Sequence, residues 1–165
     1  MNSSANTQGD GAVRLDDMVC FDLHAASRAM TAVYRPLLEP LGLTYPQYLV
    51  LAALWENGDL PVRELVRLLQ LDYGTMTPLL KRLEGRGLLR RTRNPSDERT
   101  VIVALTGDGD ALRRHAPGIY QRICDVFGFT PERAREAQDL LRFIVERANQ
   151  VADADAAAGA GSARS

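Results

Sequence analysis

Along most of this chain, apolar residues recur every three or four positions, which is the spacing of one face of an α-helix. The first such run covers residues 15–37 and predicts one long amphipathic helix, closed by Pro40 and Gly42. Thr44 is followed three residues later by Gln47, a capping-box pattern that predicts the start of a second helix. The chain is therefore expected to begin with two helices.

Two shorter helices are predicted in the middle of the chain. Pro61 is placed to open the third helix, and Asp72 is placed to cap the fourth. The fourth helix is expected to end at Gly85 and Gly87, because glycine readily adopts the backbone conformation that follows a helix C-terminus. Pro78 lies inside this segment, and its missing N–H predicts a bent or loosened first turn.

A hairpin and two further helices complete the pattern. The turn-forming residues NPSDE separate LLRRTR from the β-branched run RTVIVAL, which predicts two antiparallel strands. Thr106 and Asp108 begin a fifth helix that extends to about Phe127, and Thr130 begins a sixth. Two short helices joined by a tight link and followed at once by a hairpin are typical of a winged helix-turn-helix.

These elements predict a mainly α fold with a small β-hairpin wing. Both ends of the chain are polar or rich in small residues, so we expect a disordered N-terminus at 1–13 and a disordered tail at 151–165. The structured domain then covers 14–150, with the winged helix-turn-helix at 44–105 and long helices at 14–40 and 106–150. A short core cannot cover the apolar faces of those long helices, so we expect them to form the interface of a homodimer.

Charge is distributed unevenly over the 165 residues. The net charge is −1, yet residues 81–103 carry seven basic and three acidic side chains. A local excess of this kind in a near-neutral chain indicates a basic patch that suits double-stranded DNA. A solvated basic face with no partner is the alternative interpretation.

Hydropathy and cysteine content indicate the compartment. No apolar run approaches the roughly 20 residues that span a bilayer, and the N-terminus lacks the pattern of a secretion signal. We therefore expect a cytoplasmic protein without a membrane partner. Two cysteines 104 positions apart argue against a permanent disulfide in that reducing compartment, so each thiol is either an inert core group or a reactive one.

The predicted fourth helix has the residue order of a DNA-recognition helix. The small or hydroxylated residues Gly74, Thr75 and Thr77 come first, where the helix would enter the major groove. Lys81 and Arg82 follow, within reach of bases or phosphates. We expect this helix to contact DNA.

On the predicted wing, Arg99 is placed to enter the adjacent minor groove, and Asp97 is placed to orient its guanidinium. A surface ion pair of little energetic consequence is the alternative. Arg86 belongs to the same basic patch and is counted among the candidate DNA-binding residues. In a twofold dimer the recognition helices would lie about one DNA turn apart, ~34–36 Å, and would read a pseudo-palindromic operator.

One side of the predicted first helix carries groups that form hydrogen bonds. At about 100° per residue, this stripe consists of Cys20, His24, Ser27, Thr31 and Tyr34. The exposed N–H groups at the start of a helix favour a thiolate, whereas a capping aspartate at Asp16 or Asp17 would oppose it. A buried core thiol and a structural histidine are the alternatives.

A thiolate can attack a peroxide and become a sulfenic acid, which then condenses with a second thiol. Cys124 is the only other thiol of this chain. The stripe therefore suggests, without requiring it, that Cys20 reacts with an oxidant.

Three stretches of the sequence resemble the MarR family of winged-helix regulators. They are VCFDLHAASRAMTAVYRPLLEPLGLTYPQYLVLAALWE, LDYGTMTPLLKRLEGRGLLRRTR and SDERTVIVALTGDG. The first stretch, with its cysteine, and the TPLLKR turn resemble the organic-hydroperoxide-sensing repressors of that family, the OhrR group.

The resemblance implies roles for individual residues. Cys20 matches the peroxide-reacting cysteine, and Tyr34 and Tyr45 match tyrosines that hydrogen-bond it in the reduced protein. Cys124 matches by location a resolving cysteine that forms a disulfide with the sensing cysteine of the partner subunit. His24 departs from the family, because a third tyrosine is common at its position, and an imidazole changes the pH behaviour of the sensor.

By the same resemblance, Pro78 joins the residues of the DNA-reading helix, and Asp97 and Arg99 lie on the wing. The sequence as a whole predicts a homodimeric DNA-binding repressor with organic hydroperoxides as inducers and without a cofactor. A MarR-type regulator released by a small aromatic ligand is the nearest alternative. We expect no enzyme, because a thiol peroxidase usually needs a strand-rich scaffold, and no metal sensor, because the histidines and cysteines lack ligand spacing.

Overall fold

The computed structural model describes residues 13–162, without the side chains of Glu98, Asp153 and 155–162. The predicted disordered segment up to residue 12, and residues 163–165 of the predicted tail, lie outside the described residues. The chain divides into two compact units, with the boundary between Ile119 and Tyr120.

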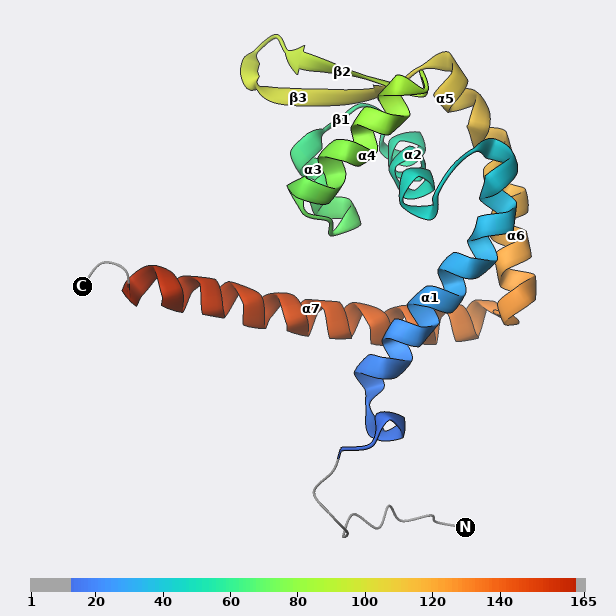
Figure 1. The fold of residues 1–165 in the computed structure, drawn as a ribbon, viewed down its shortest axis with the longest axis vertical. Helices are drawn as coiled ribbons and strands as arrows, with labels where there is room; N and C mark the ends of the chain where they lie inside the picture. The colour runs from blue at the N-terminus through green and yellow to red at the C-terminus, as the bar shows by residue number, and fades with distance from the viewer. Residues whose placement is uncertain (1–12, 163–165) are drawn as a thin grey trace. The chain divides into compact units, whose positions relative to one another are not determined.

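The helices and strands follow the order predicted from the sequence (Figure 1). The helical elements are η1 (Leu15–Asp17), α1 (Val19–Leu38), η2 (Glu39–Leu41), α2 (Tyr45–Asn57), α3 (Val62–Leu69), α4 (Tyr73–Gly85), α5 (Gly107–Ala111), η3 (Leu112–His115), α6 (Ala116–Phe127) and α7 (Pro131–Ser162), where η marks 3-10 turns. The strands are β1 (Leu60–Pro61), β2 (Leu89–Asn94) and β3 (Asp97–Leu105). The predicted fold class, a mainly α chain with a small β wing, is confirmed.

The N-terminal helix forms as predicted, but its start differs. Met18 is the N-cap of α1 and makes no side-chain cap hydrogen bond. Asp16 and Asp17 lie one turn earlier, in η1. The prediction that one of these aspartates caps the helix is wrong, because the chain forms a separate 3-10 turn before α1 begins.

The second helix begins with the predicted capping box. The Thr44 N–H donates to Oε1 of Gln47 at 2.9 Å, and the Thr44 side chain accepts from the backbone at Gln47. This reciprocal pairing satisfies two backbone donors that a helix N-terminus otherwise leaves unpaired. The sequence therefore determines where α2 begins.

The sheet contains one strand more than predicted. Its order is β1-β3-β2, and both pairings are antiparallel. The predicted hairpin is confirmed as β2 and β3, with Arg91 opposite Val103. β1 adds Leu60 opposite the same Val103. A two-residue strand is too short to produce an alternating pattern, which is why the sequence did not predict it.

The predicted fifth helix is interrupted. Thr106 caps α5 as expected, accepting from the Gly109 N–H at 3.1 Å, but a 3-10 segment separates α5 from α6. Pro117 lies in the first turn of α6, and its ring nitrogen has no hydrogen to continue an α-helical ladder. A single helix from residue 106 to 127 is therefore not formed.

The C-terminal helix is longer than the sequence suggested. Its start follows Thr130, whose hydroxyl accepts from the Arg133 N–H at 3.3 Å. The composition placed the end of structure at 150, whereas α7 continues to Ser162. Alanine has the highest helix propensity of the amino acids, and α7 continues through the alanine-rich segment for which the composition predicts disorder.

The core of the first unit lies between α2, α4 and the sheet. Its fully buried residues include Leu38, Leu51, Leu54, Leu65, Met76, Leu80, Leu83, Leu89 and Val103. A hydrogen bond also connects α2 to α5: the Trp55 indole N–H donates to the Gly109 carbonyl at 3.1 Å. Within residues 13–162, no helix is long and apolar enough to span a membrane.

Candidate DNA interface and candidate thiol site

Helix α4 has one buried and one exposed face. Its buried residues are Met76, Leu79, Leu80 and Leu83. The residues predicted to read DNA are all exposed: Gly74, Thr75, Thr77, Pro78, Lys81 and Arg82. Helix α4 follows α3 in the chain and contacts α2 and strand β2 of the hairpin (Figure 1), the arrangement of a helix-turn-helix with a wing.

The N-terminus of α4 is held by a side-chain cap. Asp72 Oδ1 accepts from the Thr75 N–H at 2.7 Å, and Oδ2 accepts from the Thr75 hydroxyl at 2.8 Å. These two hydrogen bonds, that of the N–H first, lower the pKa of the Asp72 carboxyl. The helix runs through Pro78 without a break, and Thr77 donates to the Tyr73 carbonyl at 2.8 Å.

The wing places Asp97 differently from the prediction. Its carboxylate accepts from the Arg99 backbone N–H at 3.1 Å and from the Thr100 hydroxyl at 2.6 Å. Among the described side chains, the Arg99 guanidinium forms no ion pair with Asp97 or any other residue. Within the described side chains, both the expected orientation of the Arg99 guanidinium by Asp97 and the alternative of a surface ion pair between them are therefore wrong, and Arg99 is exposed.

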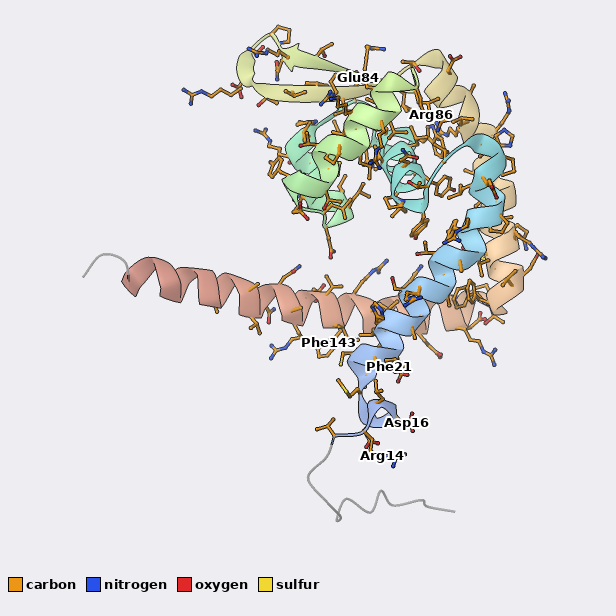
Figure 2. The ribbon with its side chains drawn as sticks, in the orientation of Figure 1. Arg14, Asp16, Phe21, Glu84, Arg86 and Phe143 are labelled. Carbon is orange, nitrogen blue, oxygen red and sulfur yellow. The ribbon has the colours of Figure 1, made fainter. Side chains whose placement is uncertain are left out.

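Part of the predicted basic patch serves the fold instead. Arg91 donates from Nη2 to Glu84 Oε2 at 2.6 Å and from Nε at 3.0 Å, and its backbone N–H donates to Oε1 at 3.1 Å. These bonds join the last turn of α4 to β2 and lower the pKa of Glu84. Figure 2 labels Glu84 and Arg86 in this region.

Arg86 connects the end of α4 to the link between α1 and α2. Its guanidinium donates to the carbonyls of Leu41 and Gly42. Gly42 has a φ of 63°, and a Cβ at this position would lie 2.8 Å from Arg86 Nη2. Glycine is thus required there for both its backbone conformation and the close approach of the arginine.

The Cys20 thiol is accessible. Cys20 is the second residue of α1 and is exposed, as is His24 one turn later. Farther along the predicted stripe, the Thr31 hydroxyl donates to the Ser27 carbonyl at 2.9 Å. The interpretation of Cys20 as a buried core thiol is excluded for this chain taken alone.

The two predicted sensor tyrosines lie together but away from Cys20. The ring centroids of Tyr34 and Tyr45 are 4.3 Å apart, and Tyr48 lies 6.0 Å from Tyr34. Burial raises the pKa of Tyr45, so its phenol keeps its proton at neutral pH and can donate. Tyr34 is fourteen residues beyond Cys20 on the same helix, about 21 Å at 1.5 Å per residue.

The second unit carries the other thiol. Cys124 is half-buried in α6, and Tyr120 precedes it by one helical turn. A side-chain hydrogen bond with Cys124, and then the Coulombic effect of that thiol, raise the pKa of Tyr120. This phenol–thiol pair is not among the predicted site residues, although a spacing of four residues on a helix is the sequence signal for it.

Comparison with known proteins identifies the family. The MarR family model matches residues 43–101. The organic hydroperoxide resistance transcriptional regulator of Bacillus subtilis is 41% identical over 138 residues, which are 84% of this chain and 94% of that protein. The chain belongs to the MarR family.

Solved structures of other MarR-type proteins agree with this assignment. Reduced AbfR of Staphylococcus epidermidis, bound to DNA, aligns with a TM-score of 0.68 at 32% identity and covers 81% of this chain and 94% of its own. Overoxidised AbfR on DNA gives a TM-score of 0.67 with the same coverage. PcaV of Streptomyces coelicolor, in complex with its natural ligand, gives 0.75 at 27% identity over 84% of this chain and 99% of its own. This MarR-family chain is a DNA-binding transcriptional regulator.

Proposed function

We propose that this MarR-family chain is a homodimeric repressor that senses organic hydroperoxides through oxidation of Cys20. The observation that carries the proposal is an exposed thiol in the first turn of α1. The relative from Bacillus subtilis, which is an organic hydroperoxide resistance regulator, supports it. AbfR structures named as reduced, overoxidised and disulfide-formed indicate that thiol chemistry occurs among related proteins.

The proposed reaction has two steps. The Cys20 thiolate attacks one oxygen of the hydroperoxide, so that an S–O bond forms, the O–O bond breaks and the alkoxide leaves as an alcohol after taking a proton. The resulting sulfenic acid condenses with the Cys124 thiol of a partner subunit, which forms a disulfide and releases water. The sulfur is oxidised and the peroxide is reduced.

A second copy of the chain completes the sensor in this proposal. Tyr34 and Tyr45 are adjacent to each other, yet about 21 Å along α1 separates Tyr34 from Cys20. A tyrosine hydrogen bond to the reduced thiol therefore requires the tyrosine pair of a partner subunit. His24, exposed one turn from Cys20, is the third candidate donor.

DNA contacts are proposed on α4 and the wing. Oxidation would change the dimer and move the two DNA-reading helices out of register with their half-sites of a pseudo-palindromic operator. The contacting residues in this proposal are Gly74, Thr75, Thr77, Pro78, Lys81, Arg82, Asp97 and Arg99; Arg86, predicted with them, has its guanidinium engaged by backbone carbonyls.

The test uses cumene hydroperoxide on the purified protein. We expect wild type to release a bound duplex and to give a disulfide-linked dimer on a non-reducing gel. Cys20→Ser should do neither, whereas Cys124→Ser should lose the dimer band and still consume one thiol per chain. Full release of DNA from the Cys20→Ser protein under peroxide would contradict thiol sensing.

A specific observation supports a second candidate function. A hollow of about 400 Å³ lies between the end of α1 with η2 and the residues from η3 into α6, with Leu37, Leu41 and Ile119 as apolar walls. Arg114 and His115 also line it and would suit an anionic aromatic ligand. PcaV binds a natural ligand, so release by a small aromatic acid is the alternative, and release from Cys20→Ser by such an acid would favour it.

A further inference from the structure

A second hollow lies where α3, α4 and the wing come together. It measures about 370 Å³ and is lined by Arg63 of α3, Tyr73 of α4, and Asp97, Arg99 and Thr100 of β3, together with apolar residues that include Pro61 and Val101. All of these residues belong to the first unit. Neither Arg63 nor Tyr73 is among the DNA contacts predicted from the sequence.

The charge in this hollow is positive. Among the described side chains, neither Arg63 nor Arg99 has an ion-pair partner. The Asp97 carboxylate is already bound by the Thr100 hydroxyl and the Arg99 N–H. These hydrogen bonds, and the more distant charge of Arg63, lower the pKa of Asp97. Of the lining residues that the structure describes, two cations and one carboxylate leave one net positive charge.

The position of the hollow indicates its ligand. The N-terminal residues of α4 are placed for the major groove, and the wing is placed for the adjacent minor groove. The strand that separates the two grooves must then pass between these elements, and the hollow is lined by both of them. A phosphodiester of that strand carries a single negative charge, which the net charge of the hollow matches.

We infer that this hollow binds a backbone phosphate of DNA, held by the Arg63 and Arg99 guanidinium groups with the Tyr73 hydroxyl as a further donor. This inference rests on DNA binding and is independent of thiol chemistry. Arginine and tyrosine contacts to phosphate fix the register of a protein on the duplex without reading its sequence. Arg63 is then a DNA-positioning contact outside the recognition helix and the wing.

The test is a salt titration of DNA affinity with two duplexes, one selected by the wild-type protein from a random pool and one of random sequence. For Arg63→Gln we expect affinity to fall roughly tenfold at 0.1 M salt on both duplexes. The slope of log K against log salt should decrease by about one per phosphate contact, hence by about two for a dimer. Arg63→Lys should keep most of the slope, since it keeps the charge.

Arg67 provides the matched control. It lies one turn beyond Arg63 on the same helix, but its guanidinium is paired with Glu64 at 2.9 Å and it does not line the hollow. Arg67→Gln also removes one positive charge, and it should leave the slope of log K against log salt unchanged. Equal effects of the two substitutions, or no effect of Arg63→Gln, would overturn the inference while leaving DNA binding by the wild type intact.

Two further measurements separate the possible outcomes. Tyr73→Phe should weaken binding to both duplexes by a similar factor, and this factor should be smaller than that for Arg63→Gln. This variant provides a readout if Arg63→Gln lowers the melting temperature. Isothermal titration with inorganic phosphate, at constant ionic strength and without DNA, should show no Arg63-dependent binding. Saturable binding of inorganic phosphate that Arg63→Gln abolishes would assign the hollow to a free anion and overturn the DNA contact.

Discussion

A single carboxylate organises the first turn of the DNA-reading helix. Asp72 accepts from both the backbone N–H and the hydroxyl of Thr75. The cap therefore occupies the Thr75 hydroxyl proton and leaves its oxygen lone pairs available to DNA. Asp72 thus caps α4 and also fixes the hydroxyl of Thr75, one of the proposed DNA contacts.

We predict that Asp72→Ala lowers the melting temperature at pH 7 by roughly 2–4 °C, because the first turn of α4 loses its cap. The folded state lowers the pKa of Asp72, so the stabilisation is present above the unfolded value of about 3.9 and is lost as pH falls through the folded value. The difference in melting temperature between Asp72→Ala and wild type should become smaller below about pH 4. Asp72→Asn is the control, since a neutral cap should show no such narrowing in thermal scans.

Three side-chain contacts meet around the end of α4. Glu84 pairs with Arg91 of β2, Arg86 donates to the link between α1 and α2, and the Gly87 carbonyl accepts from the Thr106 hydroxyl. Contacts that span 7, 19 and 45 residues of sequence thereby meet around the C-terminus of α4. The Arg86 contacts thus connect the link after α1 to the end of α4.

We predict that Gly42→Ala destabilises the protein by about 1–2 kcal/mol, because alanine is strained at positive φ and its Cβ would displace Arg86. In an Arg86→Ala background the same change should cost less, since only the backbone strain remains. Gly85→Ala is the control, with open space at its Cβ and no positive φ, and it should be neutral or stabilising. If chemical denaturation gives the same loss in the free energy of unfolding for Gly42→Ala in both backgrounds, a steric conflict with Arg86 is excluded.

Each of the two units leaves apolar side chains exposed. In α7, Leu140, Leu141 and Phe143 are 60%, 48% and 59% exposed, and in α1 Phe21 is 42% exposed (Figure 2 labels Phe21 and Phe143). Apolar groups gathered along helices in this way usually mark a protein interface. This agrees with the proposed homodimer, in which a second copy covers these residues.

We predict that Phe143→Glu converts the dimer into a monomer in sedimentation equilibrium. DNA affinity should then fall by about 100-fold, since a monomer binds only one half-site. Gln138→Glu is the control, because it adds the same charge at an exposed polar position of α7 and should leave the dimer intact. A monomeric wild-type protein, or a dimeric Phe143→Glu variant with full affinity, would contradict the proposed interface.

Local signals in the sequence were sufficient for most elements. The capping box at Thr44, the Asp72 cap and the turn between β2 and β3 act within a few residues, so they determine where α2, α4 and the hairpin begin or end. Predictions from local signals were wrong at two places. Pro117 interrupts the predicted fifth helix, and the propensity of alanine extends α7 into a segment interpreted as disordered.

The sequence by itself determined the helix-turn-helix with its wing and the exposed face of α4, because periodicity, caps and turn residues are properties of neighbouring positions. It could not determine which charges of the basic patch remain available. Arg86 is bound by carbonyls more than forty residues away, and Arg63 faces the wing across a hollow. Such partners meet only when the chain folds, since contacts between distant segments depend on packing and leave no local pattern.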